Sequence, residues 1–257
     1  MLDETFYIDG IDARSVGIQL QKPIEFSEAV PIAETQTIPG RNGDLIFETG
    51  SYENRGGSAS CFCLQKDVEK AISSAGRFLM GKKGYRRLET SDDPDHFWMA
   101  RVENSPQISM RLRTLAPFEI GLDCKPQRFL KSGESKIVFG SSQSVSSVCG
   151  EFLCGDMVCG AYGSSLLNPY GQVAKPFVTV YGQGDGVLTI GKYAVSIKGM
   201  DGVLYLDSET QNAYNDDGNQ NNKINAPVFP VIESGENVVG FNGGITSVEI
   251  VPRWWEV

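Results

Sequence analysis

Two turn-forming dipeptides, Pro39-Gly40 and Asn42-Gly43, stand close together early in the chain and are separated by Arg41 alone. Asn-Gly is the strongest short-range signal for a two-residue hairpin turn, because both central residues of that turn need a positive φ. Residues 35–38 and 45–48 flank the two dipeptides and favour extended structure. The pattern therefore predicts a projecting β-ribbon with a tight turn at its end.

The tip of this predicted ribbon is charged, because Arg41 and Asp44 both stand there. Projecting ribbons of this kind more often hold neighbouring subunits together than perform chemistry. We therefore expect an inter-subunit contact along the ribbon. The residues expected to form it are Ile38, Pro39, Gly40, Arg41, Asn42, Gly43, Asp44 and Leu45.

The length of 257 residues exceeds the roughly 100–150 residues of a typical single domain, so two domains are expected. The composition changes over residues 123–147, which contain proline, glycines and a serine-rich run. Segments of that composition are typical of linkers. We interpret this stretch as the connection between a first domain at residues 1–130 and a second at 131–257.

The first half of the chain reads as short strands with one helix among them. Between Lys66 and Met80 the apolar residues recur at helical spacing, and Gly81 follows as a stop signal. One strand enters a turn at Asp9-Gly10. These patterns predict an antiparallel sheet with one helix packed against it. The strands expected are residues 5–12, 16–21, 57–64, 86–90, 97–102 and 107–113.

From Pro176 onward the pattern is β throughout. The glycine-rich segment Gly182–Gly186 lacks the spacing of a phosphate-binding loop and precedes a strand, so we interpret it as a hairpin turn. Asp201-Gly202 gives a second hairpin signal. Short strands with turns every 8–12 residues indicate a β-sandwich. The strands expected are residues 177–181, 186–190, 193–197, 203–206, 238–241 and 245–251.

The net charge of −9 argues against a nucleic-acid-binding surface, which needs clustered lysines and arginines. The first five residues are acidic and lack the apolar core of a signal peptide. No apolar run reaches the roughly 18–20 residues that a membrane helix needs. We expect a protein that is made in a cytoplasm and does not insert into a membrane.

The sequence offers little for catalysis. Nucleophilic catalysis needs a base beside the nucleophile, and His96 is the one histidine in the sequence. It follows an acidic turn that contains Pro94, so we interpret it as a solvated loop residue. No pair of glycosidase carboxylates can be located from the sequence. We therefore expect no catalytic residue and no cofactor.

The residues that could bind a metal are also poorly arranged. The six cysteines include no Cys-x-x-Cys pair, which argues against a zinc site. Cys61 and Cys63 are expected to be buried thiols on one face of a strand. The oxygen-rich segment Asn215–Asn222 lacks the residue order of a calcium loop and is interpreted as solvated. The remaining feature, a five-residue recurrence of cysteine, has no physical explanation: Cys149, Cys154 and Cys159.

Two of the three tryptophans lie at the C-terminal end, in Arg253-Trp254-Trp255. Tryptophans can serve as platforms for sugar rings, but these two end an alternating strand. We therefore expect core closure or interface packing from them, in preference to glycan stacking.

Taken together, these residues resemble a distal tail protein of long-tailed, non-contractile bacteriophages or their prophages. The resemblance is spread in order over nearly the whole chain. It fails at the insertion that holds Cys149 to Cys159. The segments that carry it are Phe6-Tyr7-Ile8-Asp9-Gly10-Ile11-Asp12 with Gly17-Ile18, Ile38 to Leu45 with Tyr52-Glu53-Asn54, Gly84-Tyr85-Arg86-Arg87-Leu88 before Ser91-Asp92-Asp93-Pro94-Asp95, Asn168-Pro169 with Pro176 and Tyr181-Gly182, and Arg253-Trp254-Trp255.

The resemblance implies a hub at the tip of a phage tail, without catalysis. In that family the first domain is a split-barrel-like sheet with one helix, and six copies form a ring continuous with the tail tube. The second domain is a galectin-like β-sandwich. The implied partners are further copies of the chain, the tail tube protein, a tail-associated hub protein, and receptor-binding or baseplate proteins. DNA would pass through the ring without specific binding, in a virion assembled in the bacterial cytoplasm.

A rival interpretation is a carbohydrate-binding module that contacts the host envelope through the second domain. Enlarged members of the family carry inserted sugar-binding domains, but 257 residues leave no room for a separate one. A cell-wall hydrolase is disfavoured because no catalytic constellation is recognisable. The hub interpretation is therefore preferred.

Overall fold

The computed structural model describes residues 4–64, 68–104, 115–140, 159–160 and 163–257. The described chain is mainly β, and α1 (Val68–Met80) is its one α-helix, as the sequence predicts. The chain divides into two compact units, Met1–Arg128 with Val257, and Phe129–Glu256. No helix among the described residues is long and apolar enough to span a bilayer.

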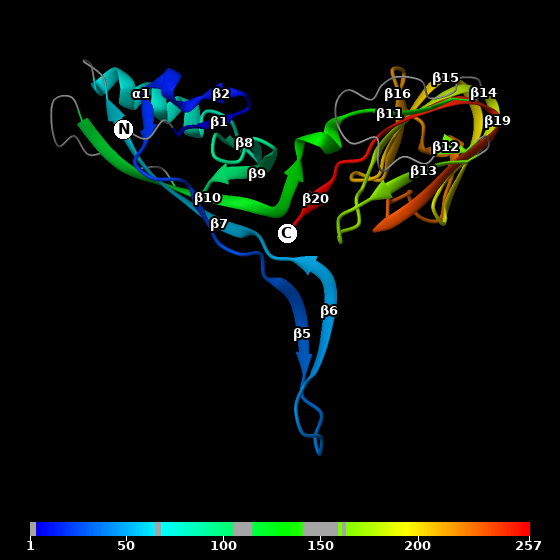
Figure 1. Cartoon of the computed structure of the whole chain (residues 1–257), viewed down its shortest axis with the longest axis horizontal. Coiled ribbons are helices and arrows are strands. Elements are labelled where there is room, and N and C mark those ends of the chain that lie inside the picture. The colour runs from blue at the N-terminus through cyan, green and yellow to red at the C-terminus, as the bar shows by residue number, and fades with distance from the viewer. Residues whose placement is uncertain (1–3, 65–67, 105–114, 141–158, 161–162) are drawn as a thin grey trace. The chain divides into compact units, whose positions relative to one another are not determined.

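The first unit is built on an antiparallel sheet with the order β2-β1-β8-β9-β10-β7-β3, in which β4 also pairs with β7 (Figure 1). The predicted turn at Asp9-Gly10 is present: both residues have positive φ, and Ile8 pairs with Ile11 across it. The strands are β1 (Phe6–Ile8), β2 (Ile11–Asp12), β3 (Ile18–Leu20), β4 (Glu25–Phe26), β7 (Arg55–Leu64), β8 (Arg86–Thr90), β9 (His96–Val102) and β10 (Leu115–Leu130), with a 3-10 turn at Ala13–Val16.

Helix α1 forms because its small and apolar residues recur at helical spacing and cover one face of this sheet. Ala71, Ala75 and Leu79 are buried, and the helix closes with a hydrogen bond from the Gly81 N–H to the Arg77 carbonyl (2.8 Å). Together with buried strand residues they form the core of the first unit, whose largest members include Phe6, Ile18, Leu88, Trp98, Phe118 and Ile120.

The second unit is a single curled sheet with the order β12-β13-β19-β14-β15-β16-β17, and β11 and β18 are added at its sides. Its buried residues form a separate core. Its strands are β11 (Ile137–Gly140), β12 (Cys159–Gly160), β13 (Gly163–Asn168), β14 (Phe177–Ile190), β15 (Tyr193–Asp207), β16 (Asn212–Asn215), β17 (Gly218–Asn219), β18 (Ile224–Asn225) and β19 (Gly235–Val251), with 3-10 turns at Lys131–Glu134 and Asn221–Lys223. The last strand, β20 (Trp255–Glu256), lies outside this sheet and pairs with β10.

The two hairpin turns predicted in this half are wrong. Gly182–Gly186 lies inside β14, and Asp201-Gly202 lies inside β15, so that Gly182 pairs with Gly202 between two continuous strands. The register shifts at Gly184 to Gly186, which marks a β-bulge. The glycines that predict turns from the local sequence instead mark the positions at which the long strands bend.

The bend lets each long strand line one core with both of its halves. In β14, Val178 and Val180 are buried before the glycine segment, and Leu188 and Ile190 are buried after it. All four belong to the same core cluster. The curled sheet therefore wraps around its core with fewer and longer strands than the sequence suggests.

The stretch predicted as a linker contains regular secondary structure in its described part. Residues 123–130 are the last part of β10, and Cys124 and Leu122 are buried in the first core. The serine-rich run at 141–147, Cys149, Cys154 and the expected strand at 107–113 lie outside the described residues, and Cys159 begins β12.

Candidate interaction surface

The predicted ribbon is a separate element of the first unit, and we call it the arm. It consists of β5 (Pro31–Gln36), β6 (Leu45–Tyr52) and the loop at residues 37–44. In the described structure β5 and β6 pair only with each other, and Figure 1 shows them extending away from the other strands of this unit. Every residue of β5 is exposed, so the arm has no core of its own.

Apolar side chains lie on both faces of the arm. Ile46 pairs with Thr35 and Phe47 pairs with Glu34, and neighbouring pairs in a ladder point to opposite faces. Ile46 is 63% exposed and Phe47 is 52% exposed. A two-stranded hairpin is marginal in water by itself, so an arm that exposes apolar groups on both faces is suited to contact another surface.

The turn at the arm's tip differs from the prediction. Gly43 has a positive φ but Asn42 does not, which excludes the two-residue Asn-Gly turn. The last strand pair is Gln36 with Leu45, which leaves an eight-residue loop. The turn is instead made at Pro39-Gly40, where the Arg41 N–H donates to the Ile38 carbonyl (3.2 Å).

This turn follows from ordinary turn chemistry. Proline at the second position and glycine with φ of +83° at the third are what a type II turn requires. The Thr37 hydroxyl donates to Asp44 (2.8 Å) and closes the loop at its base. Asp44 is therefore used within the loop, while Arg41 is exposed at the tip.

A polar cluster holds the root of the arm against the sheet. Asn54, which follows β6, donates to the Tyr85 hydroxyl (2.6 Å) and to Asp123 Oδ1 (2.9 Å). Tyr85 Oη and Arg101 Nε both donate to Asp123 Oδ2, at 3.1 Å and 2.6 Å. The cluster joins four segments of the first unit, and on the incoming side the Glu53 N–H donates to the Val30 carbonyl (2.9 Å).

The electrostatics of the cluster favour an ionised Asp123. Burial opposes ionisation, but hydrogen bonds from Arg101, Asn54 and Tyr85 outweigh it and hold the pKa of Asp123 below its usual value. No sequence pattern predicts this cluster, although Asn54 and Tyr85 both lie in segments that carry the resemblance. The contacts join residues 22 to 69 positions apart, and no short pattern indicates such pairings.

The C-terminal residues sit inside the second unit. Trp254 is buried in its core, and its ring lies 6.2 Å from that of Tyr170. Arg253 Nη1 donates to Asp207 (2.6 Å), and Trp255 Nε1 donates to the Val173 carbonyl (2.9 Å). An interface role for these residues stays a prediction.

His96 is not the solvated loop residue that was predicted. It begins β9, its side chain is 15% exposed, and its Nδ1 lies 2.6 Å from Asp93 Oδ1. Arg128 Nη2 donates to the other oxygen of Asp93 (2.5 Å). Burial opposes ionisation of Asp93, but its hydrogen bonds with His96 and Arg128 keep its pKa below the usual value. The contact with Asp93 holds the histidine side chain at the start of β9.

The buried cysteines have thiols of low reactivity. Cys61, Cys63 and Cys124 are free thiols in the first core. Burial raises the pKa of Cys61 and of Cys124 to about 12 and raises the pKa of Cys63 as well. Since the thiolate is the reactive form, these side chains act as small apolar groups.

The asparagine-rich segment is more ordered than predicted. Asn212 Oδ1 accepts from Asn219 Nδ2 and Asn221 Nδ2, at 3.0 Å and 2.7 Å, and Asn221 Oδ1 accepts from the Ala213 N–H (2.6 Å). These oxygens stabilise a short hairpin. In the described part of the chain no group of three or more acidic, histidine or cysteine side chains could hold a metal ion.

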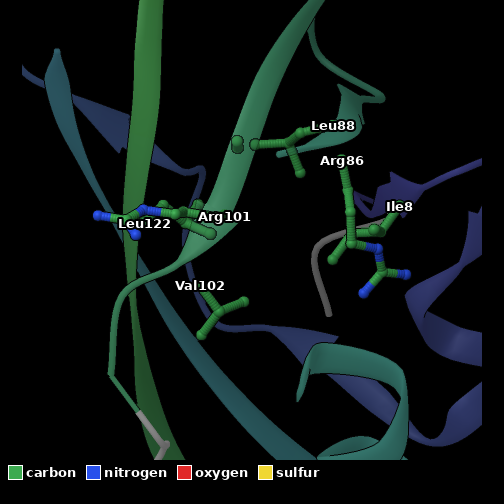
Figure 2. A pocket seen from close by; sticks show the side chains of 7 residues that line it. Ile8, Arg86, Leu88, Arg101, Val102 and Leu122 are labelled. Atoms are coloured by element: carbon green, nitrogen blue, oxygen red, sulfur yellow. The ribbon is translucent and has the colours of Figure 1, made fainter. Parts of the chain in front are cut away.

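A small apolar pocket lies in the first unit and is drawn in Figure 2. Its volume of about 10 Å³ suits at most one water molecule, far below the roughly 300–1,000 Å³ of a ligand site. Arg101 is directed away from Arg86 in this view, toward the opposite face of the sheet. The lining residues are Ile8, Arg86, Leu88, Ala100, Arg101, Val102 and Leu122.

Comparison with known proteins identifies solved structures that share this fold. No protein-family model matches the sequence, and no curated protein matches it either. Among solved structures, the chain is similar to the SPP1 Dit protein, described as a paradigm of the hub adsorption apparatus in phages that infect Gram-positive bacteria, with a TM-score of 0.69 and 11% identity over 97% of this chain and 98% of that one.

A second similar structure is a chain of the phage P2 baseplate in its activated conformation with Ca. The TM-score is 0.54 at 8% identity, over 96% of this chain and 98% of that one. Identities this low establish the fold and leave the function to argument. The chain has, over nearly its whole length, the fold of a phage distal tail (Dit) hub protein.

Proposed function

We propose that the chain is a structural component of a phage tail tip, where six copies form a ring that joins the tail tube to the baseplate or receptor-binding apparatus. The observation that carries this proposal is the fold shared with SPP1 Dit over 97% of the chain. The exposed arm supports it, since an element without a core of its own needs a neighbour. In this role the protein catalyses no reaction.

The proposed partners follow from the position in the tail. One face of the ring would meet the tail tube protein, and the other would meet a tail-associated hub protein and receptor-binding or baseplate proteins. The net charge of −9 suits a channel through which DNA passes without being held. The ring would be assembled in the bacterial cytoplasm and located at the distal end of the tail in the virion.

The carbohydrate-binding alternative is less well supported. The aromatic residues that could stack on sugars form a row in the second unit, where the Phe177 and Tyr205 rings lie 5.9 Å apart and the Tyr205 and Tyr214 rings 5.5 Å apart. Arg253 lies 5.6 Å from the Phe177 ring centre. The rings therefore face one another and an arginine, which leaves less flat surface for a sugar ring.

The proposal is tested by measuring the mass of the purified protein by light scattering behind a sizing column, with negative-stain images of the peak. Six copies of the 28.0 kDa chain give about 168 kDa, and annular particles at that mass are expected. A chain that stays monomeric at every concentration would count against ring formation by the chain alone. A glycan array would then test the alternative.

The arm's part in the ring is tested at its tip by Arg41→Glu. If the tip contacts a neighbouring copy, this reversal of an exposed charge should weaken ring formation at least tenfold while the monomer stays folded, as judged by circular dichroism. Lys198→Glu, an equally exposed reversal in the second unit, is the matched control. An unaffected ring would show that the tip lies outside the interface.

A further inference from the structure

Arg55 is a buried cation at the root of the arm. It is the first residue of β7, where the chain returns from the arm, and it pairs with the buried Cys124 of β10. Its side chain is 7% exposed. A guanidinium carries five N–H donors and stays charged at all ordinary pH values. Burying it is costly unless those donors and that charge are matched.

The chain itself supplies few partners for the N–H donors and the charge of Arg55. Among the described residues, Arg55 Nε has no hydrogen-bond acceptor. Its one ion pair within the described part of the chain is long, 3.9 Å from Nη2 to Glu28 Oε2, and the Glu28 side chain is 98% exposed. A pair at that distance with a fully solvated carboxylate contributes little.

Arg86 is a second buried arginine of this unit, and the chain supplies hydrogen-bond acceptors for its guanidinium. Its side chain is 10% exposed, close to the value for Arg55. Nε donates to Asp9 (3.0 Å), and Nη1 donates to the Phe78 and Leu79 carbonyls at the end of α1, at 2.6 Å and 3.4 Å. Two arginines with equal burial thus differ in whether acceptors are supplied.

We propose that Arg55 is a receptor for a carboxylate supplied by the arm of a second copy of this chain. This inference rests on the proposed ring, and it assigns Arg55 as a residue that binds the neighbouring copy. The guanidinium is fixed by burial, so an incoming carboxylate meets a donor that is already oriented.

The arm carries carboxylates that suit this role. Glu34 and Glu48 are exposed, lie on opposite faces of the arm, and form no salt bridge in the described part of the chain. Glu34 pairs with the exposed Phe47, so on that face a carboxylate and an apolar ring would be delivered together. The contact would complete an ion pair and cover apolar surface in one step.

The distinguishing experiment compares Arg55→Met with Arg86→Met. Removing an unmatched buried charge should leave the thermal unfolding temperature of the monomer unchanged or raised, whereas Arg86→Met should lower it because Asp9 and two carbonyls lose their donor. Arg55→Met should nevertheless weaken self-association at least tenfold, measured by analytical ultracentrifugation. A merely structural Arg55 would give the opposite pattern, with a less stable monomer and unchanged association per folded chain.

The source of the carboxylate is tested with Glu34→Gln and Glu48→Gln, each alone and combined with Arg55→Met. One of the two should weaken association by itself and add nothing to Arg55→Met, while Glu28→Gln should have no effect. If the wild type associates and Arg55→Met associates equally well, this inference is overturned and the ring stands. If both glutamates add fully to Arg55→Met, the arm is not the donor and the proposal is also overturned. If the wild type does not associate at any concentration, this inference is overturned together with ring formation by the chain alone.

Discussion

At the scale of single residues, the arm's orientation depends on Asp123. Its carboxylate receives hydrogen bonds from Asn54, Tyr85 and Arg101, and these lower its pKa in the folded chain. A carboxylate with a lowered folded pKa stabilises the fold above its unfolded pKa, here near 3.8. That contribution is lost as the pH falls through the folded value.

The prediction at this scale concerns Asp123→Asn. Because hydrogen bonds to charged groups are worth about 1.5–3 kcal/mol, the variant should lose about 1–3 kcal/mol of unfolding free energy at pH 7, measured by urea denaturation. The difference from the wild type should shrink as the pH falls below 3.8 and through the lower folded pKa, because the wild-type carboxylate then becomes protonated as well. Asp95→Asn, the same change at an exposed carboxylate, is the control. A loss that stays the same at low pH would contradict the electrostatic explanation.

At the scale of elements, the glycine-containing segments show which turns the sequence can predict and which it cannot. Asp9-Gly10 makes the expected turn, whereas Asn42-Gly43 gives way to the neighbouring Pro39-Gly40 turn, and Gly182–Gly186 is a bend inside a strand. The local sequence allows a positive φ in each case. What decides among turn, loop and bulge is pairing with distant strands, which no local pattern contains. Helix α1 was predictable because its periodicity is local.

The bend in the second unit requires a residue without a side chain at position 244. A Cβ at Gly244 would lie 1.7 Å from the Gln183 carbonyl oxygen, a backbone atom that cannot move aside. Gly244→Ala should therefore destabilise the second unit by about 3 kcal/mol, measured by thermal or urea unfolding. Gly171→Ala is the matched control, because a Cβ there meets nothing within 4 Å. Equal stability of the two variants would show that the strands can separate at the bend without cost.

At the scale of the whole molecule, each unit has its own buried core. Length and pattern lead to an expectation of two domains, because a change from mixed to purely β patterning is visible without any contact information. The local composition did not predict the secondary structure of residues 123–130. Residues 123–130 have the proline and polar character of a linker, yet they continue β10 as a strand. Ladder hydrogen bonds to β7 and burial of Cys124 outweigh the local composition.

Two separate cores should unfold in two steps. Leu88 in the first core and Leu188 in the second are a matched pair, 1% and 0% exposed. A buried Leu→Ala change costs about 2–5 kcal/mol through lost burial and the cavity left behind. In scanning calorimetry we expect two transitions, with Leu88→Ala lowering the temperature of one and Leu188→Ala lowering the other. A single transition displaced by both variants would contradict independent unfolding of the two cores.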